Sequence, residues 1–221
     1  MTTKTSLIPN SMNRSSVQLL FLRISLVFGL AWLAFSPQAQ AVCQQACDAP
    51  TDNTAFGLSV FALNLTGSEN TAIGSGPLFS NTTGSQNTAS GDGALNSNTT
   101  GNANAAFGFH ALFSNTTGNF NTATGFNALL VNTTGNYNTS IGEGTLQSNT
   151  NGYYNTASGA VALNRNTTGY GNTADGYKTL TNNTLGYYNT ASGSYALHND
   201  TTGFQNTAGG GAALISNTIG P

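Results

Sequence analysis

Charged residues are scarce in this chain. Asp, Glu, Lys and Arg together make up 5% of its 221 residues, and only five of them are cations. So few basic side chains cannot form a patch for the phosphate backbone of a nucleic acid. Two histidines and two cysteines also leave little material for a metal or catalytic centre. We therefore expect no nucleic-acid partner, no cofactor and no metal.

Long apolar runs are missing too, with one exception near the start. Three basic residues, the last of them Arg23, precede the apolar run 24–35, and Ala39-Gln40-Ala41 then supplies a small-residue cleavage pattern. This order of parts is typical of a secretory signal peptide. The alternative, a transmembrane anchor, needs about 20 apolar residues. We predict a signal peptide over residues 1–41 and a protein that is secreted or displayed at the cell surface.

Cysteine occurs only in the segment 42–52, which we interpret as a short cap or linker. Because an exported protein meets an oxidising compartment, we expect Cys43 and Cys47 to form a disulfide, within this segment or between two chains. A zinc site is disfavoured, since two thiolates with no nearby histidine fill only half of a zinc shell. After cleavage, residues 42–221 carry two cations against seven acids, a net charge of −5.

From Asn53 to the last residue, the sequence is a repeat. A unit of seventeen residues, N-T-A-x-G, then x-x-A-L, then N-T-T-G, recurs ten times without an insertion. A short fixed period predicts a solenoid in which each repeat is one coil stacked on the one before. We predict an all-β fold, a parallel β-solenoid or β-roll of ten coils over residues 53–221, ~48 Å long at the usual strand spacing. We number the columns of each coil 1 to 17 from its opening Asn.

The repeat predicts two strands in each coil. Column 3 is almost always Ala and column 5 always Gly, whereas column 4 varies freely, as in a short strand whose alternate residues face in and out. Column 9 holds one large apolar residue per coil, and we expect a second short strand around it to build the core. The predicted core ladder is Phe61, Leu78, Leu95, Leu112, Leu129, Leu146, Leu163, Leu180, Leu197 and Leu214.

Columns 1, 12 and 15 are the other constant positions. Column 12 is Asn except at Asp200, and column 15 is Gly in every coil, where a positive φ or a close approach between coils would require it. Stacked Asn side chains can hydrogen-bond along the solenoid axis as ladders, or can simply favour turns. The predicted column 1 ladder is Asn53, Asn70, Asn87, Asn104, Asn121, Asn138, Asn155, Asn172, Asn189 and Asn206.

These N-T-A-x-G-x-x-A-L units resemble the YadA-like head repeats of trimeric autotransporter adhesins. The resemblance covers residues 53–221 and implies a parallel β-roll, surface display and binding to host or matrix components. Two features depart from that family's pattern. The unit of seventeen residues is longer than the usual head unit, and the sequence stays in the repeat to Pro221 without a stalk or anchor pattern.

Titratable residues are dispersed over the repeats. Asp92 and Glu143 both occupy column 6 but lie three coils apart, about 14 Å along the axis, which is too far for paired-carboxylate catalysis. His110 and His198 occupy different columns of distant coils, and we expect each to be a lone surface residue on its own face. We predict that the protein is not an enzyme.

Two columns of Thr suggest a second kind of function. Column 2 includes Thr71, Thr88 and Thr122, and column 13 includes Thr82 and Thr99. Flat solenoid faces with outward Thr columns can order water in an ice-like lattice, so ice binding is an alternative function. The other interpretation is that Thr favours strands and cross-strand ladders.

Aromatic residues gather in columns 16 and 17 from coil 4 to coil 9. They can pack locally around the turn, or they can bind sugars or a second protomer. Our candidate contact stripe is Phe120, Tyr137, Tyr154, Tyr170, Tyr188 and Phe204.

The last coil keeps the repeat pattern, so we expect its strand edge to be open to another chain. We predict homo-oligomers, formed side by side along the aromatic stripe or end to end through coil 10. The predicted function is a secreted, non-catalytic structural or adhesive solenoid, self-associating at the cell surface or in an extracellular fibre, with glycan or matrix ligands as further candidate partners.

Overall fold

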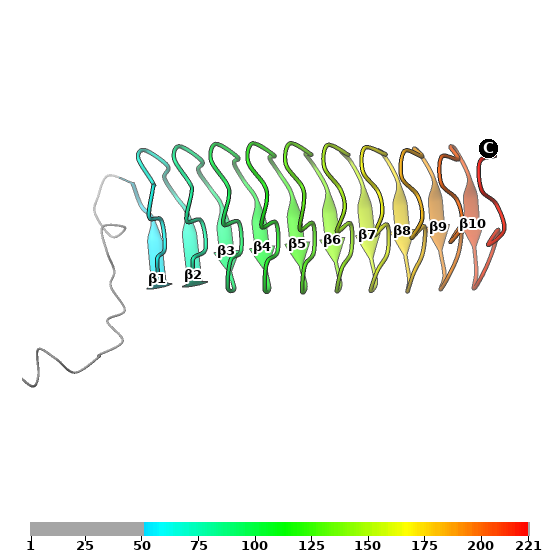
Figure 1. Cartoon of the computed structure of the whole chain (residues 1–221), viewed down its shortest axis with the longest axis horizontal. Helices are drawn as coiled ribbons and strands as arrows, with labels where there is room; N and C mark the ends of the chain where they lie inside the picture. The colour runs from blue at the N-terminus through cyan, green and yellow to red at the C-terminus, as the bar shows by residue number, and fades with distance from the viewer. Residues whose placement is uncertain (1–50, 221) are drawn as a thin grey trace, which may run out of the picture. The chain divides into compact units, whose positions relative to one another are not determined.

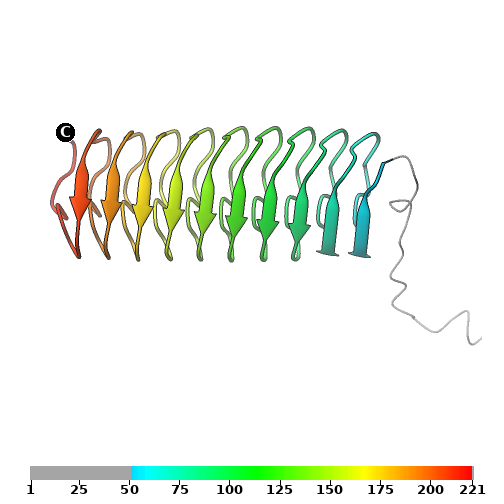
Figure 2. The ribbon, with the colours of Figure 1, turned by 180° about the vertical axis from the view of Figure 1, so that it is seen from behind.

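The computed structural model describes residues 51–220, which form one row of stacked coils (Figure 1). Ten parallel strands pair in sequence order in a single sheet, and Figure 2 shows the same coils from behind. The predicted parallel β-solenoid is therefore confirmed. The strands are β1 (Thr54–Leu58), β2 (Thr71–Ser75), β3 (Thr88–Ser90), β4 (Ala105–Phe107), β5 (Thr122–Thr124), β6 (Thr139–Ile141), β7 (Thr156–Ser158), β8 (Thr173–Asp175), β9 (Thr190–Ser192) and β10 (Thr207–Gly209).

Each strand is short and repeats the same register. From β3 onward a strand has three residues, columns 2 to 4, and each residue pairs with its own column in the next coil, as Thr122 does with Thr139. The middle residue points inward and is buried, while its two neighbours face outward. Because the period is constant, every side chain lies above its counterpart, and one arrangement serves all ten coils.

The predicted second strand is wrong. The residues around column 9 form a turn, and each column 9 residue has a positive φ, between 48° and 53°. This left-handed conformation is unusual for a residue with a Cβ atom. Here the turn directs the side chain into the core, while the backbone still pairs with the next coil: the Leu112 amide donates to the Ala128 carbonyl at 3.0 Å. Burial and this hydrogen bond hold a conformation that leucine alone does not favour.

The core is narrow and consists of Ala and Leu. Column 3, column 8 and column 9 bury Ala, Ala and Leu, and the Leu side chains from coil 2 to coil 9 are inaccessible to solvent. Phe61 in coil 1 is 8% exposed, and Leu214 in coil 10 is 51% exposed because no described coil lies beyond it. Each buried Leu contributes about 2 kcal/mol, so the continuous stack supplies a core that one coil could not.

Two coils replace core alanines with hydroxyl residues. In coil 8, Thr179 takes column 8, and its hydroxyl donates to the Gly193 carbonyl at 2.7 Å. In coil 6, Ser140 takes column 3 and Thr145 takes column 8, and both are buried. The Ser140 hydroxyl donates to the Thr145 carbonyl at 2.9 Å, and the Thr145 hydroxyl donates to the Gly159 carbonyl at 3.0 Å. Both hydroxyl groups therefore donate to backbone carbonyls, and neither is left as an unpaired donor in the core.

Glycine is required in column 15 by close approach between coils. A Cβ atom on Gly135 would overlap the carbonyl oxygen of Gly152 and the side-chain oxygen of Asn132. No positive φ occurs among the column 15 glycines of the described coils, so close approach is the explanation that holds. Column 5 differs, because its glycines have φ values between 109° and 140° and also abut the next coil.

Two predictions fall outside the described residues: the signal peptide 1–41 and the Cys43–Cys47 disulfide. Within residues 51–220, no helix is long and apolar enough to cross a membrane.

Candidate functional site

The column 1 asparagines form a hydrogen-bonded ladder through the interior. The side-chain amide of Asn121 donates to Oδ1 of Asn104 in the preceding coil at 3.1 Å and to the Gly135 carbonyl of its own coil at 2.8 Å. The Asn121 backbone amide donates to the same Oδ1 at 3.0 Å. These side chains are buried, and their polar groups are used within the solenoid.

The column 12 asparagines form a second ladder beside the first. The side-chain amide of Asn132 donates to Oδ1 of Asn115 at 2.8 Å and to the Gly135 carbonyl at 3.1 Å. The Gly135 carbonyl thus accepts one hydrogen bond from each ladder, which uses both of its lone pairs. In these coils the amide groups of both ladders are therefore paired with one another and with the column 15 carbonyls.

The second ladder is interrupted at Asp200. This buried residue has no amide to donate, and within the described chain neither its Oδ2 atom nor Oδ1 of Asn183 below it has a hydrogen-bond partner. Burial raises the pKa of Asp200 to about 6, although a hydrogen bond from the Gly203 backbone acts in the opposite direction. The sequence showed this substitution, but its effect depends on the ladder geometry.

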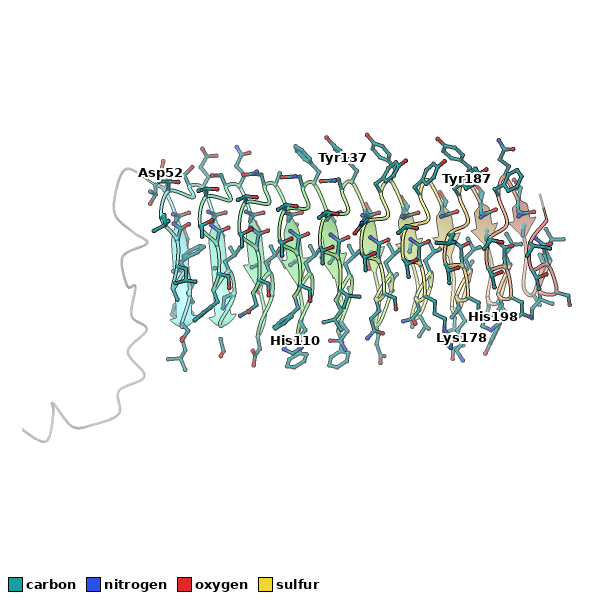
Figure 3. All side chains as sticks on the ribbon, turned by 45° about the horizontal axis from the view of Figure 1, so that its top comes forward. Asp52, His110, Tyr137, Lys178, Tyr187 and His198 are labelled. Atoms are coloured by element: carbon teal, nitrogen blue, oxygen red, sulfur yellow. The ribbon has the colours of Figure 1, made fainter. Side chains whose placement is uncertain are left out.

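The histidines lie along one edge of the solenoid and have aromatic neighbours (Figure 3). His110 stacks on Phe109 with ring centroids 3.8 Å apart, and His198 lies edge-on to Tyr195 at 5.3 Å. The expectation that the two histidines lie on different faces is therefore wrong. Five coils still separate them, about 24 Å at the usual spacing. No cluster of three potential metal ligands occurs within residues 51–220.

Columns 16 and 17 carry two stacks of aromatic rings along the opposite edge, where Figure 3 labels Tyr137 and Tyr187. In column 17, Tyr137 stacks on Phe120 at 4.9 Å and on Tyr154 at 5.0 Å. In column 16, the stack runs through Tyr153, Tyr170, Tyr187 and Phe204, with centroid distances of 4.8 to 5.2 Å. We call these two stacks together the aromatic edge.

The two stacks meet in the middle of the solenoid. Tyr153 lies edge-on to Tyr154, and Tyr188 leans edge-on against Tyr170 at 5.2 Å. Gly171 leaves the space for this, since a Cβ atom there would contact the Tyr188 ring. Desolvation and the neighbouring phenols, Tyr153 first, raise the pKa of Tyr170, which keeps its hydroxyl protonated. The candidate stripe from the sequence is thus extended by Tyr153 and Tyr187.

Stacking decides what the aromatic edge presents to a partner. The stacked rings are nearly parallel, with interplanar angles of 5° for Phe120 and Tyr137 and 6° for Tyr153 and Tyr170, so they cover one another's faces. Their outer rims and hydroxyls remain exposed, and Tyr154 is 59% accessible. Sugars pack against open ring faces. The exposed edges of stacked rings instead form a ridge that can pack against another protein surface.

The edge that carries the histidines has aromatic clusters that sequence reasoning missed. Phe109 stacks on Phe126 at 5.3 Å, and both are exposed. Farther along, Lys178 lies over the rings of Tyr177 and Tyr195, at 5.2 and 5.7 Å from their centroids. A hydrogen bond with Tyr177 and the charges of the two phenols raise the pKa of Lys178. A column-by-column search for aromatics in columns 6 and 7 could have found these clusters.

The two Thr columns have different surroundings. In column 13 the hydroxyls from Thr82 to Thr201 each donate to the next coil, as Thr99 does to the Thr116 carbonyl at 2.9 Å. In column 2 the Thr hydroxyls, including those of Thr88 and Thr122, face outward and have no hydrogen-bond partner in the described structure. Column 4 on the same face varies from coil to coil, with Phe107 in coil 4, Thr124 in coil 5 and Asp175 in coil 8, so this face does not carry a uniform Thr array.

Comparisons with protein-family models, with curated proteins and with solved structures find no match to this chain.

Proposed function

We propose that this protein is a non-catalytic structural and adhesive solenoid that is exported, displayed at the cell surface or in an extracellular fibre, and associates with copies of itself. The aromatic edge is the observation that carries the proposal. It is an exposed apolar ridge that runs over coils 4 to 9, larger than the scattered apolar residues of an ordinary soluble surface. The resemblance to trimeric adhesin head repeats points in the same direction.

The edge favours a second copy as its partner. Covered ring faces disfavour sugar binding, and hydroxyl groups at the rim of an apolar ridge can pair across a two-fold interface. A net charge of −5 over residues 42–221 gives little repulsion between copies. Glycan and matrix components are the other ligands that the proposal allows.

Sedimentation velocity of the purified protein over a range of concentrations tests the proposal. We expect the sedimentation coefficient to rise with concentration, and we expect cells that display the protein to adhere to one another. A protein that stays monomeric at high concentration, and whose display leaves adhesion unchanged, would contradict the proposal. Adhesion only to matrix-coated or glycan-coated surfaces would assign those ligands instead.

Ice binding is the second candidate, favoured by the free outward hydroxyls of column 2 and their common register along the sheet. It predicts thermal hysteresis that is lost when Thr71, Thr88 and Thr122 are replaced by lysine, because bulky side chains disrupt an ordered water layer. The matched control replaces the exposed Thr83, Thr100 and Thr117 of column 14. Absence of thermal hysteresis in the unaltered protein would eliminate this candidate.

A further inference from the structure

The column 12 ladder weakens as it approaches Asp200. The amide-to-Oδ1 distance is 2.8 Å between Asn166 and Asn149, and 3.1 Å between Asn183 and Asn166. No such bond joins Asp200 to Asn183, and beyond the interruption Asn217 reaches Oδ1 of Asp200 only at 3.4 Å. The column 1 ladder continues past the same coils, with Asn206 bound to Asn189 at 3.0 Å. The defect is therefore local to column 12.

The defect consists of acceptors without donors. In other coils the column 12 amide donates to Oδ1 of the coil below and to the column 15 carbonyl of its own coil. At Asp200 both donors are missing, so Oδ1 of Asn183 is unpaired and the Gly203 carbonyl keeps only the hydrogen bond from Asn189, at 2.7 Å. The Oδ2 atom of Asp200 takes the place of the amide and is itself an unpaired acceptor. Buried acceptors that face one another destabilise the junction.

We propose that Asp200 is a proton-binding position, at which one proton taken from solvent onto Oδ2 supplies the missing donor to Oδ1 of Asn183 and completes the ladder between coils 8 and 9. A protonated carboxyl group has one O–H donor and is close to a carboxamide in shape, so it fits the position that Asn occupies in the other coils. Release of the proton restores the unpaired acceptors and loosens the junction.

The surroundings of Asp200 contain no competing charge. Coil 8 presents the neutral amide of Asn183 and coil 10 that of Asn217, and within residues 51–220 Asp200 forms no ion pair. His198, the nearest ionisable residue along the chain, has its Nδ1 atom 3.1 Å from the Lys178 carbonyl on the outer edge. The raised pKa of Asp200, about 6, is consistent with a carboxyl group that is buried without a cation.

The sign of the pH effect follows from the two protonation states. Because the folded chain holds the proton more tightly than the unfolded chain, the contribution of Asp200 to stability is largest below pH 3.8, the ordinary pKa. It falls as pH rises from there to about 6 and is absent above. For the junction of coils 8 and 9, this corresponds to about tenfold greater hydrogen-exchange protection at pH 5 than at pH 7.5.

Hydrogen exchange of the whole protein, corrected for the intrinsic pH dependence, tests the inference in three chains. In the unaltered protein, the amides of Leu180 and Leu197 should gain about tenfold protection between pH 7.5 and pH 5. Asp200→Asn restores the residue of the repeat. In this variant the two amides should already be more protected at pH 7.5, and their protection should not rise further at pH 5. Asp175→Asn is the control, because Asp175 lies on the exposed strand face. This variant should show the same rise of about tenfold in protection as the unaltered protein. Protonation of the histidines affects the pH dependence of exchange equally in all three proteins, so it cancels when they are compared.

A carbon-13 NMR titration of the Asp200 carboxyl group gives a second readout that does not depend on a variant. A midpoint near 6 is expected, and a midpoint near 4 would overturn the inference. Equal pH responses in the unaltered protein and Asp200→Asn would overturn it as well. Calcium or another divalent cation that raised protection at pH 7.5, reversibly with a chelator, would assign the gap to a metal ion instead of a proton.

Discussion

The interior of coils 4 to 9 and the aromatic edge differ in how closely they keep the repeat. The buried columns 1, 3, 8, 9, 12 and 15 depart from it at only four residues, Ser140, Thr145, Thr179 and Asp200, whereas columns 16 and 17 change from coil to coil. Inside, each side chain must bond or pack against an identical neighbour above and below, so one deviation affects two junctions. At the aromatic edge a ring needs only another ring to stack on, and Phe and Tyr both serve. The interior therefore determines the fold, and the edges are free to carry function.

The largest effect is expected from an interior residue in mid-solenoid. Leu129→Ala removes a side chain that is inaccessible to solvent and should lower the free energy of unfolding by 2–5 kcal/mol, about the usual cost of such a cavity. Leu214→Ala changes the same column where the side chain is half exposed, and should cost about 1 kcal/mol. Urea unfolding followed by circular dichroism measures both. Equal losses would contradict the core described here.

A second variant copies the Asp200 defect into an intact part of the ladder. Asn132→Asp at pH 7.5 leaves Oδ1 of Asn115 unpaired and removes one donor from the Gly135 carbonyl. We expect a loss of about 1–3 kcal/mol, the cost of buried unpaired acceptors, which shrinks as the pH is lowered to 5. Asn199→Asp, at an exposed position, is the control and should change stability little. Urea unfolding at pH 7.5 and at pH 5 measures the loss of stability. A loss of equal size at the two pH values would contradict the ladder geometry.

The period and the inward alanines and leucines were sufficient to predict the solenoid from the sequence, because stacking requires the same residue at the same column. The turn at column 9 was not predictable, since Leu in a left-handed conformation is selected by its neighbours and not by its own preference. The aromatic stripe was recognised, yet its division into two stacks depends on how Tyr188 leans over Gly171. The consequence of Asp200 required the hydrogen-bond directions of the ladder.

An edge variant should have a smaller effect on stability. Tyr137→Ser removes two stacked contacts, to Phe120 and Tyr154, and should cost about 1–2 kcal/mol. Gln205→Ser lies in the same column outside the stack and should be close to neutral. Thermal unfolding at low protein concentration separates the effect on folding from any effect on association. A neutral Tyr137→Ser would show that the stack contributes nothing to the fold.

The smallest effects compare the two Thr columns. Thr99→Val removes the hydroxyl that donates to the Thr116 carbonyl and should cost about 1 kcal/mol. Thr122→Val removes an outward hydroxyl without a described partner and should stay within about 0.5 kcal/mol of the unaltered protein. Chemical denaturation of the two variants in parallel provides the comparison. The reverse order would mean that column 2, not column 13, supports the structure.

The most direct test of the proposed function compares the two edges by sedimentation velocity. Tyr137→Ser/Tyr154→Ser disrupts the aromatic edge, and Phe109→Ser/Phe126→Ser removes an exposed stacked pair from the opposite edge. Circular dichroism must first show that both keep the strand signal. We predict that the first variant remains monomeric at concentrations where the second and the unaltered protein associate. Equal association of all three proteins, or a monomeric unaltered protein, would contradict the account.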